Sequence, residues 1–306
     1  MEILTKTWLR PASSGSGEIY SKLWHGDEKR AIVQISHGMA EHSGRYNHFA
    51  SFLAERGFVV CINEHAGHGP HAENLGYFAE QDGIKHVISD MKVLHDEIMQ
   101  EFPEIPIFLL GHSMGSFLSR KFITSYGDGL AGCILSGTAG PNSALGFGKM
   151  IAAIQKKTKG PMSEGNLLDK IAFGSYLKTI SNPVNENAWL SRVDELCKEY
   201  ENDTYCGFKF TAGGFYDLFT LLEEINNKDW ANKVPISLPI YIFSGDDDPV
   251  GEYGKGVLTV YNRLLNAKLM DVTLKLYPRG RHEMLNEINK EEVYEDVLNW
   301  LLAHLR

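Results

Sequence analysis

One serine in this sequence stands in a setting that suits nucleophilic chemistry. Ser113 is the centre of the motif G-H-S-M-G at residues 111–115, between an apolar run at 107–110 and a helical pattern at 116–126. A sharp turn from strand to helix would strain the serine backbone and hold its hydroxyl near free helix N–H groups, which favour an anionic intermediate. We therefore predict that Ser113 is a nucleophile. We expect Gly111, His112 and Gly115 to support it. The two glycines are needed because Cβ atoms at their positions would collide in the turn.

A serine hydroxyl attacks efficiently only when a base takes its proton and a third group orients that base. Where a serine occupies such a strand-to-helix turn, the acid and then the histidine follow it in the chain, each after a late strand. Asp248 closely follows an apolar run at 239–244, and His282 follows another at 272–277. We therefore predict that His282 is the base and that Asp248 orients it.

Three consecutive aspartates at 246–248 compete for the role of the acid. We choose Asp248 because it lies three residues past Gly245 and directly before Pro249. The two preceding aspartates are expected to shape the turn, as aspartate often does. His304 is the other histidine beyond the acid, but its place in a terminal helix predicts a solvated side chain.

A histidine–glycine pair, His37-Gly38, directly follows the apolar run at 31–36. A loop at that place supplies one backbone N–H of an oxyanion hole, and the residue after the nucleophile supplies the other. These positions are Met39 and Met114, and their side chains matter little because the donors are main-chain groups. Two such N–H groups would stabilise the charge of a tetrahedral intermediate.

Histidines recur at intervals of three in the segment H-A-G-H-G-P-H at 65–71, which raises the question of a metal site. The glycines and the proline of this segment prevent a helix that would present all three imidazoles on one face. We predict a structural loop beside the active-site crevice and no metal. Acyl transfer through a serine also needs no organic cofactor.

The segments that must position these residues alternate between strand and helix. Continuous apolar runs are typical of parallel strands buried on both faces, with helices covering the sheet. We predict such strands at 31–36, 58–62, 107–110, 131–136, 239–244 and 272–277, and helices at 45–56, 84–101, 116–126, 255–265 and 291–305. Two shorter alternating segments, 3–9 and 18–24, predict an antiparallel start.

Between residues 141 and 234 this alternation stops, and the sequence becomes helical in character and rich in Phe, Met, Tyr and Leu. We interpret this stretch as a helical cap inserted into one α/β domain. Residues 1–140 and 235–306 would form the core, a mostly parallel sheet with helices on both faces, and residues 141–234 the cap.

Composition limits the partners. The 306 residues carry a formal net charge of -9, which argues against binding to nucleic acid. The N-terminus lacks the apolar stretch of a secretory signal, and no window of about 18 apolar residues could span a bilayer. We expect a cytoplasmic protein with at most peripheral membrane contact through the cap. None of the four cysteines has zinc-type spacing.

Several motifs together resemble those of a known family. H-G-M-A-E-H-S-G-R-Y at 37–46 is similar to the HGxxEHSxRY signature of the monoacylglycerol lipase and lysophospholipase family, the serine aminopeptidase S33-like hydrolases. G-H-G at 67–69, the motif at 111–115 and H-E-x-x-N-E at 282–287 resemble further family motifs. The resemblance implies an α/β-hydrolase fold. It also implies the same roles for the serine, the aspartate and the histidine that their order along the chain predicts.

The sequence departs from the family pattern at a few positions near these motifs. Glu64 stands where the family loop usually has aspartate, Pro70-His71 replaces x-Ser, and Ser116 stands where a further glycine is common. None of these positions belongs to the predicted triad. We expect hydrolysis of a small carboxylic ester, and the apolar cap favours a monoacylglycerol, a lysophospholipid or a similar medium-to-long acyl ester.

Two alternative functions stay open. An amidase or aminopeptidase could use the same triad and would hold a substrate ammonium in an acidic cluster of the cap, although a solvated helix face explains such a cluster better. The candidates for that cluster are Glu195, Glu199, Glu201 and Asp203. A non-catalytic binding protein could share the fold, but it would be expected to lack part of the triad or the oxyanion loop, and all parts are present here.

Overall fold

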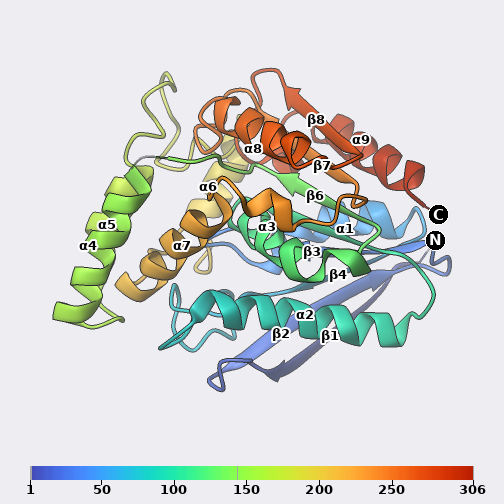
Figure 1. The fold of residues 1–306 in the computed structure, drawn as a ribbon, viewed down its shortest axis with the longest axis horizontal. Helices are drawn as coiled ribbons and strands as arrows, with labels where there is room; N and C mark the ends of the chain where they lie inside the picture. The colour runs from blue at the N-terminus through green and yellow to red at the C-terminus, as the bar shows by residue number, and fades with distance from the viewer. Residues whose placement is uncertain (1, 143, 306) are drawn as a thin grey trace.

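The computed structural model describes residues 2–142 and 144–305. Within these residues, an eight-stranded sheet has the strand order β1-β2-β4-β3-β5-β6-β7-β8 (Figure 1). β2 pairs antiparallel with β1 and with β4, and all pairs from β4 to β8 are parallel. The strands are β1 (Leu4–Pro11), β2 (Glu18–His25), β3 (Ala31–Ser36), β4 (Phe58–Asn63), β5 (Ile107–His112), β6 (Gly132–Ser136), β7 (Ile240–Gly245) and β8 (Val272–Tyr277). The predicted antiparallel start and mostly parallel sheet are confirmed.

Helices cover both faces of this sheet. Alternate strand residues point to opposite faces, so Ile32 and Val33 of β3 belong to two different apolar cores. The first core contains side chains of α2, α3 and α8, and the second contains side chains of α1 and α9. These helices are α1 (Asn47–Ala54), α2 (Gly83–Glu101), α3 (Met114–Tyr126), α8 (Lys255–Asn266) and α9 (Lys290–Ala303). The part of the chain that the structure describes also contains the short 3-10 segments η1 (Ser43–Tyr46), η2 (Gly127–Gly129), η3 (Trp230–Lys233) and η4 (Met284–Asn286).

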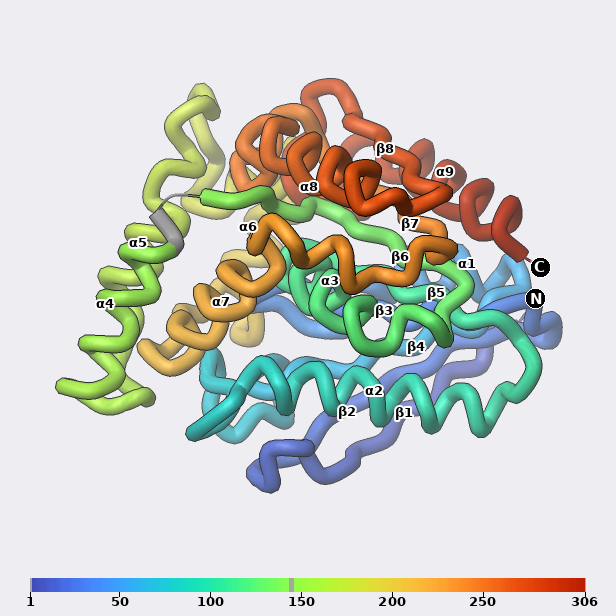
Figure 2. The backbone as a smooth tube through the Cα atoms, in the orientation of Figure 1, coloured from blue at the N-terminus to red at the C-terminus, as the bar shows by residue number. Residues whose placement is uncertain are grey.

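The chain leaves the sheet after β6 and returns to it at β7 (Figure 2). We call residues 137–239 the β6–β7 insertion. Its helices are α4 (Ala144–Lys159), α5 (Asn166–Phe173), α6 (Asp194–Asn202) and α7 (Ala212–Ile225). α7 packs against α4 within the insertion and also against α2 and α3, which cover the sheet, so it attaches the insertion to the rest of the molecule. In the described part of the chain, we find no helix with the length and hydropathy that a bilayer span needs.

Two helices differ from the sequence prediction at their first turns. The helix expected at 116–126 begins at Met114, because Gly115 is a helical residue here and does not delay the start. The helix expected at 45–56 is observed as two elements, η1, which begins at Ser43, and α1, which ends at Ala54. Both differences concern element ends, which sequence patterns define least well.

Candidate active site

Ser113 lies in the turn between β5 and α3, in a backbone conformation that residues other than glycine rarely adopt. Its φ is 52° and its ψ is -120°, and such strain costs about 1–3 kcal/mol and is concentrated at functional sites. Gly115 makes the turn possible, since a Cβ there would lie 1.9 Å from the carbonyl oxygen of Ser36. The turn therefore packs against the end of β3 and holds Ser113 at the N-terminus of α3.

Asp248 and His282 are brought together from the loops that follow β7 and β8. Nδ1 of His282 lies 2.9 Å from Oδ2 of Asp248, and both side chains are buried. The Ser244 hydroxyl and the Val250 backbone N–H also donate to this carboxylate, at 3.0 and 2.9 Å. Because an ionised carboxylate only accepts hydrogen bonds, the proton of the neutral imidazole lies on Nδ1 and Nε2 is left as an acceptor.

Burial and charge shift the protonation of these groups in opposite directions. Burial alone would lower the pKa of His282, but the Asp248 carboxylate raises that pKa above its ordinary value. Burial alone would raise the pKa of Asp248, but His282 lowers it, so the carboxylate stays ionised. The His112 ring centre lies 4.8 Å from that of His282. Burial is the larger cause and the nearby His282 the smaller cause that together lower the pKa of His112 to about 4. His112 is therefore neutral near pH 7 and adds no positive charge beside His282.

Ser113 and His282 line one cavity with a volume of about 520 Å³. Nε2 of His282 is buried and has no hydrogen-bond partner among the described residues. In the absence of substrate, the hydrogen bond between a nucleophile and its base is often long or open. The site can therefore transfer a proton to His282 from a hydroxyl group that approaches Nε2 within the cavity.

Two backbone N–H groups beside Ser113 are available to bind an anionic oxygen. Met39 and Met114 both line the cavity, and their N–H groups donate no hydrogen bond within the described residues. A Cβ on Gly38 would lie 3.3 Å from the Cβ of Ser113, so the loop after β3 contacts the serine. Free donors at this place suit an oxygen that gains negative charge during a reaction.

Buried histidines contact the loop after β3 and hold it in place. Nδ1 of His37 lies 2.8 Å from the carbonyl oxygen of Gly38, and its Nε2 accepts the backbone N–H of His65 at 3.0 Å. The ring centre of His37 lies 4.2 Å from that of His65 and 5.1 Å from that of His68. Burial lowers the pKa of His37 and of His68 to about 3. His71 lies apart from this cluster and stacks on a tyrosine, so the histidines of segment 65–71 do not converge on one point.

Among the described residues, one set of side chains has the types and the spacing found in metal sites, namely His42, Asp203 and Cys206. Nε2 of His42 lies 2.9 Å from Oδ2 of Asp203, and its Nδ1 accepts the backbone N–H of Gly44 at 3.2 Å. A metal on Nε2 would require a proton on Nδ1, where it would face that N–H. The arrangement fits a hydrogen-bonded pair between the loop after β3 and the insertion better than it fits a metal site.

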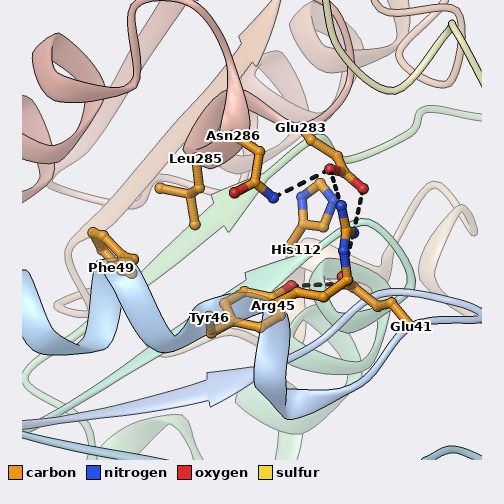
Figure 3. A pocket seen from close by; sticks show the side chains of 8 residues that line it. All are labelled: Glu41, Arg45, Tyr46, Phe49, His112, Glu283, Leu285 and Asn286. Atoms are coloured by element: carbon orange, nitrogen blue, oxygen red, sulfur yellow. Dashed lines mark hydrogen bonds and ion pairs between the residues drawn. The ribbon is translucent and has the colours of Figure 1, made fainter. Parts of the chain in front are cut away.

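A buried ionic network beside His112 was given no role by the sequence analysis. The Arg45 guanidinium donates to both oxygens of Glu283 at 2.6 Å and to Glu41 at 2.8 Å (Figure 3). Burial alone would raise the pKa of both carboxylates, but Arg45 lowers each of them. Since Glu283 directly follows His282, this network connects the loop after β8, which carries His282, to the loop after β3.

Glu41 carries the network further into the loop after β3. Its Oε1 accepts the Tyr46 hydroxyl at 2.7 Å and the backbone N–H of Gly38 at 2.5 Å. The carboxylate thus fixes the peptide group between His37 and Gly38, which is one before the group that carries the Met39 N–H. The signal for this network is present in the sequence, because Glu41, Arg45 and Tyr46 are fixed letters of the 37–46 motif.

The insertion contributes directly to the surroundings of His282. The Trp189 ring centre lies 5.2 Å from that of His282, and the Trp189 carbonyl accepts the His282 backbone N–H at 3.4 Å. The next carbonyl, of Leu190, accepts the Glu283 N–H at 2.7 Å. The sequence analysis did not identify Trp189, because nothing in the pattern of an aromatic-rich segment distinguishes it from its neighbours.

The cavity wall is mostly apolar where the insertion forms it. Its apolar side chains from this segment include Ile171, Phe173, Leu177, Phe208, Leu218, Phe219 and Leu222. The four acidic residues considered for binding a substrate ammonium lie on α6 or directly after it, and none of them lines the cavity. The apolar part of the wall suits an acyl chain, and the acidic residues of the insertion that do line the cavity are Asp169 and Glu186, together with the basic Lys170 and Lys209.

A family model and curated relatives show which proteins this chain is similar to. The family model for serine aminopeptidase, S33, matches residues 27–289. A monoacylglycerol lipase of Mycolicibacterium smegmatis is 27% identical over 298 residues, which are 96% of each chain. Human monoglyceride lipase is 26% identical over 285 residues, covering 89% of this chain and 82% of the relative.

Solved structures of similar proteins extend over the whole chain. The crystal structure of a highly thermostable carboxyl esterase from Bacillus coagulans, in complex with glycerol, superposes with a TM-score of 0.93 at 30% identity and covers 99% of both chains. A lipase in an open form superposes with a TM-score of 0.91 at 27% identity. The chain therefore belongs to the serine aminopeptidase S33 family of α/β-hydrolases and is a serine hydrolase that cleaves esters.

Proposed function

We propose that the protein hydrolyses monoacylglycerols or lysophospholipid-like esters, with Ser113 as nucleophile, His282 as base and Asp248 as the residue that orients the base. The observation that carries this proposal is the position of Nε2 of His282. That atom has no hydrogen-bond partner among the described residues, Nδ1 of the same ring is held by Asp248, and His282 lines the same cavity as Ser113. A serine, a histidine and a carboxylate in these relations are the parts of a two-step acyl transfer.

In the first step, Oγ of Ser113 attacks the ester carbonyl while Nε2 of His282 takes its proton. The N–H groups of Met39 and Met114 stabilise the oxyanion, and losing one such donor costs about 10²–10³ in rate. The imidazolium then protonates the leaving alcohol. A water molecule activated by the same base hydrolyses the acyl-enzyme, and the reaction needs no metal or organic cofactor.

The substrate class follows from the cavity and from the relatives. An acyl chain would lie against the apolar wall that α5, α7 and the segment before α7 provide. The M. smegmatis relative is named monoacylglycerol lipase, and the related esterase structure holds glycerol. These observations support a glycerol ester, with residues 141–234 acting as the cap over the acyl chain.

The cap would also contact the lipid surface that holds the substrate. On α4, Phe147, Met150 and Ile154 share one face and are 57%, 52% and 56% exposed. Lys157 and Lys159 are exposed at the end of the same helix. Exposed apolar side chains next to lysines suit an anionic membrane surface. Sedimentation with phosphatidylglycerol vesicles tests this, since Phe147→Ser should reduce binding and leave turnover of a short soluble ester unchanged.

Glycerol release from monoacylglycerols of increasing chain length, by the wild type and by Ser113→Ala, tests the proposed function. We expect release that favours medium or long chains and is abolished in the variant. Cleavage of p-nitrophenyl esters without cleavage of any glycerol ester would show that the substrate class is wrong. Faster cleavage of acyl amides than of the matching esters would favour the amidase alternative.

A further inference from the structure

The β6–β7 insertion holds the loop after β3 at the residue that follows Met39. The carbonyl oxygen of Ala40 accepts the Tyr200 hydroxyl at 2.8 Å and the backbone N–H of Gly207 at 2.9 Å. Ala40 is 5% exposed and Tyr200 is 8% exposed, and both residues border the cavity that Ser113 lines. A single backbone oxygen of the loop thus accepts two hydrogen bonds from the insertion, and Tyr200 is 160 residues away from it in the chain.

Ala40 needs such support because its backbone is strained. Its φ is 52°, in the left-handed region, which costs a residue with a Cβ about 1–2 kcal/mol. On the other side of Met39, the Gly38 N–H is fixed by the Glu41 carboxylate. The proposed oxyanion donor therefore lies between two peptide groups that are each tied by a hydrogen bond, one within the loop and one from the insertion.

The Tyr200 side chain is itself held in place. The Arg45 guanidinium lies over its ring, 4.9 Å from the ring centre, and a Cβ on Gly207 would lie 3.2 Å from the same ring. The His42–Asp203 hydrogen bond joins the same two segments nearby. Tyr200 thus directs its hydroxyl at Ala40 from a fixed position and does not simply fill space.

We propose that Tyr200 is a positioning residue for the oxyanion hole, so that the insertion serves the chemical step and not only the choice of substrate. This rests on the proposed function, because it takes the Met39 N–H as an oxyanion donor. The N–H acts on the charge that develops in the tetrahedral intermediate. Its misplacement should therefore lower kcat by the same factor for every acyl chain and leave KM unchanged.

The Tyr200→Phe variant removes one hydroxyl and keeps the ring on Arg45. Tyr205→Phe is the matched control, because Tyr205 lies in the same segment and contacts His42 and not Ala40. We would measure kcat and KM for p-nitrophenyl acetate, butyrate and octanoate, and inhibition by a trifluoromethyl ketone whose adduct carries an oxyanion. We expect Tyr200→Phe to lose about tenfold or more in kcat on all three esters and to bind the ketone more weakly by a similar factor, while Tyr205→Phe resembles the wild type.

A kcat of Tyr200→Phe within twofold of the wild type would overturn the proposal. A loss that appears in KM and grows with chain length would also overturn it, because Tyr200 would then be part of the acyl-chain wall. Hydrogen exchange of residues 38–41 is a second readout. It should rise in Tyr200→Phe alone, and unchanged exchange would contradict a positioning role. Ester turnover by the wild type that does not depend on Ser113 would instead overturn the proposed function, so the two failures are distinguishable.

Discussion

His282 and Asp248 share a buried hydrogen bond of 2.9 Å between Nδ1 and Oδ2, and the same carboxylate oxygen accepts the Ser244 hydroxyl. This bond sets the tautomer of the imidazole and leaves Nε2 as the acceptor beside the cavity. It also sets the charge of the site, because the carboxylate raises the pKa of His282 above its ordinary value. The pH dependence of ester turnover should therefore report on this pair.

The first prediction concerns the acid limb of the pH profile. Only neutral His282 can take the serine proton, so kcat/KM should fall as the pH drops through the raised pKa of His282. Asp248→Asn should move that limb to lower pH, because the charge that raises the pKa is gone, and should reduce kcat by about 10⁴. Profiles for p-nitrophenyl butyrate check this, and a limb that does not move would contradict the role of Asp248.

Ser244→Ala should shift the same limb in the opposite direction. Without the Ser244 hydroxyl, the Asp248 carboxylate keeps fewer donors and interacts more strongly with His282, so the pKa of His282 should rise further. The loss in kcat should be no more than about tenfold, since one neutral hydrogen bond is removed. A limb that moves to lower pH in this variant would show that Ser244 acts otherwise.

The ionic network of Arg45 should matter for stability. Glu283→Gln removes the buried carboxylate that accepts two of the three Arg45 hydrogen bonds, and the free energy of unfolding should fall by about 1–3 kcal/mol. Glu292→Gln is the matched control, because Glu292 pairs with Lys275 at the surface and should cost less than about 0.5 kcal/mol. Urea unfolding of the two variants separates them, and equal losses would contradict a special contribution of the network.

The histidines below the loop after β3 should make the protein sensitive to acid. The pKa of His37 and of His68 is about 3 in the folded state, below the unfolded value of about 6.5. As the pH falls below 6.5, the unfolded chain binds protons that the folded chain does not. The contribution of these histidines to the free energy of unfolding is therefore fully present above that pH. As the pH falls below it, the free energy of unfolding should decrease by about 1.4 kcal/mol per pH unit for each histidine that stays neutral in the folded state.

Urea unfolding between about pH 7 and pH 5 measures this slope, and His68→Gln should reduce it. His282 and Asp217 act in the opposite direction, because the pKa of His282 is raised and burial raises the pKa of Asp217 to about 6, but His37, His65, His68 and His112 all act in the first direction. The pKa of His65 is also lowered well below its ordinary value, chiefly by burial. A stability that does not change over this range would contradict the presence of neutral buried histidines.

The sequence was sufficient to predict the fold because buried parallel strands have a distinctive pattern. All residues of β3, β4, β5, β6 and β7 are buried, and these are the continuous apolar runs of the sequence. The carboxyl ends of parallel strands lie at one edge of the sheet, so Ser113, Asp248 and His282 could be related to each other by chain order alone. β8 was also identified, although its residues are only partly buried.

The contacts between the insertion and the core could not be predicted in the same way. Tyr200 and Ala40 are separated by 160 residues, and Arg45 and Glu283 by 238 residues. No periodicity specifies which tyrosine of an aromatic-rich segment reaches a given carbonyl oxygen. Glu41 and Arg45 lie within a recognised motif, but their partners depend on how the loops after β3 and β8 meet in three dimensions.

The nucleophile is tested most directly by mapping the residue that a fluorophosphonate modifies. The intact protein should gain one phosphonyl group and lose its ester turnover, and peptide mass spectrometry should place that group on Ser113. The modification should be lost in Ser113→Ala and much slower in Asp248→Asn, because the base is then no longer held in the productive tautomer. Labelling of a different serine, or rapid ester turnover by Ser113→Ala, would contradict the account.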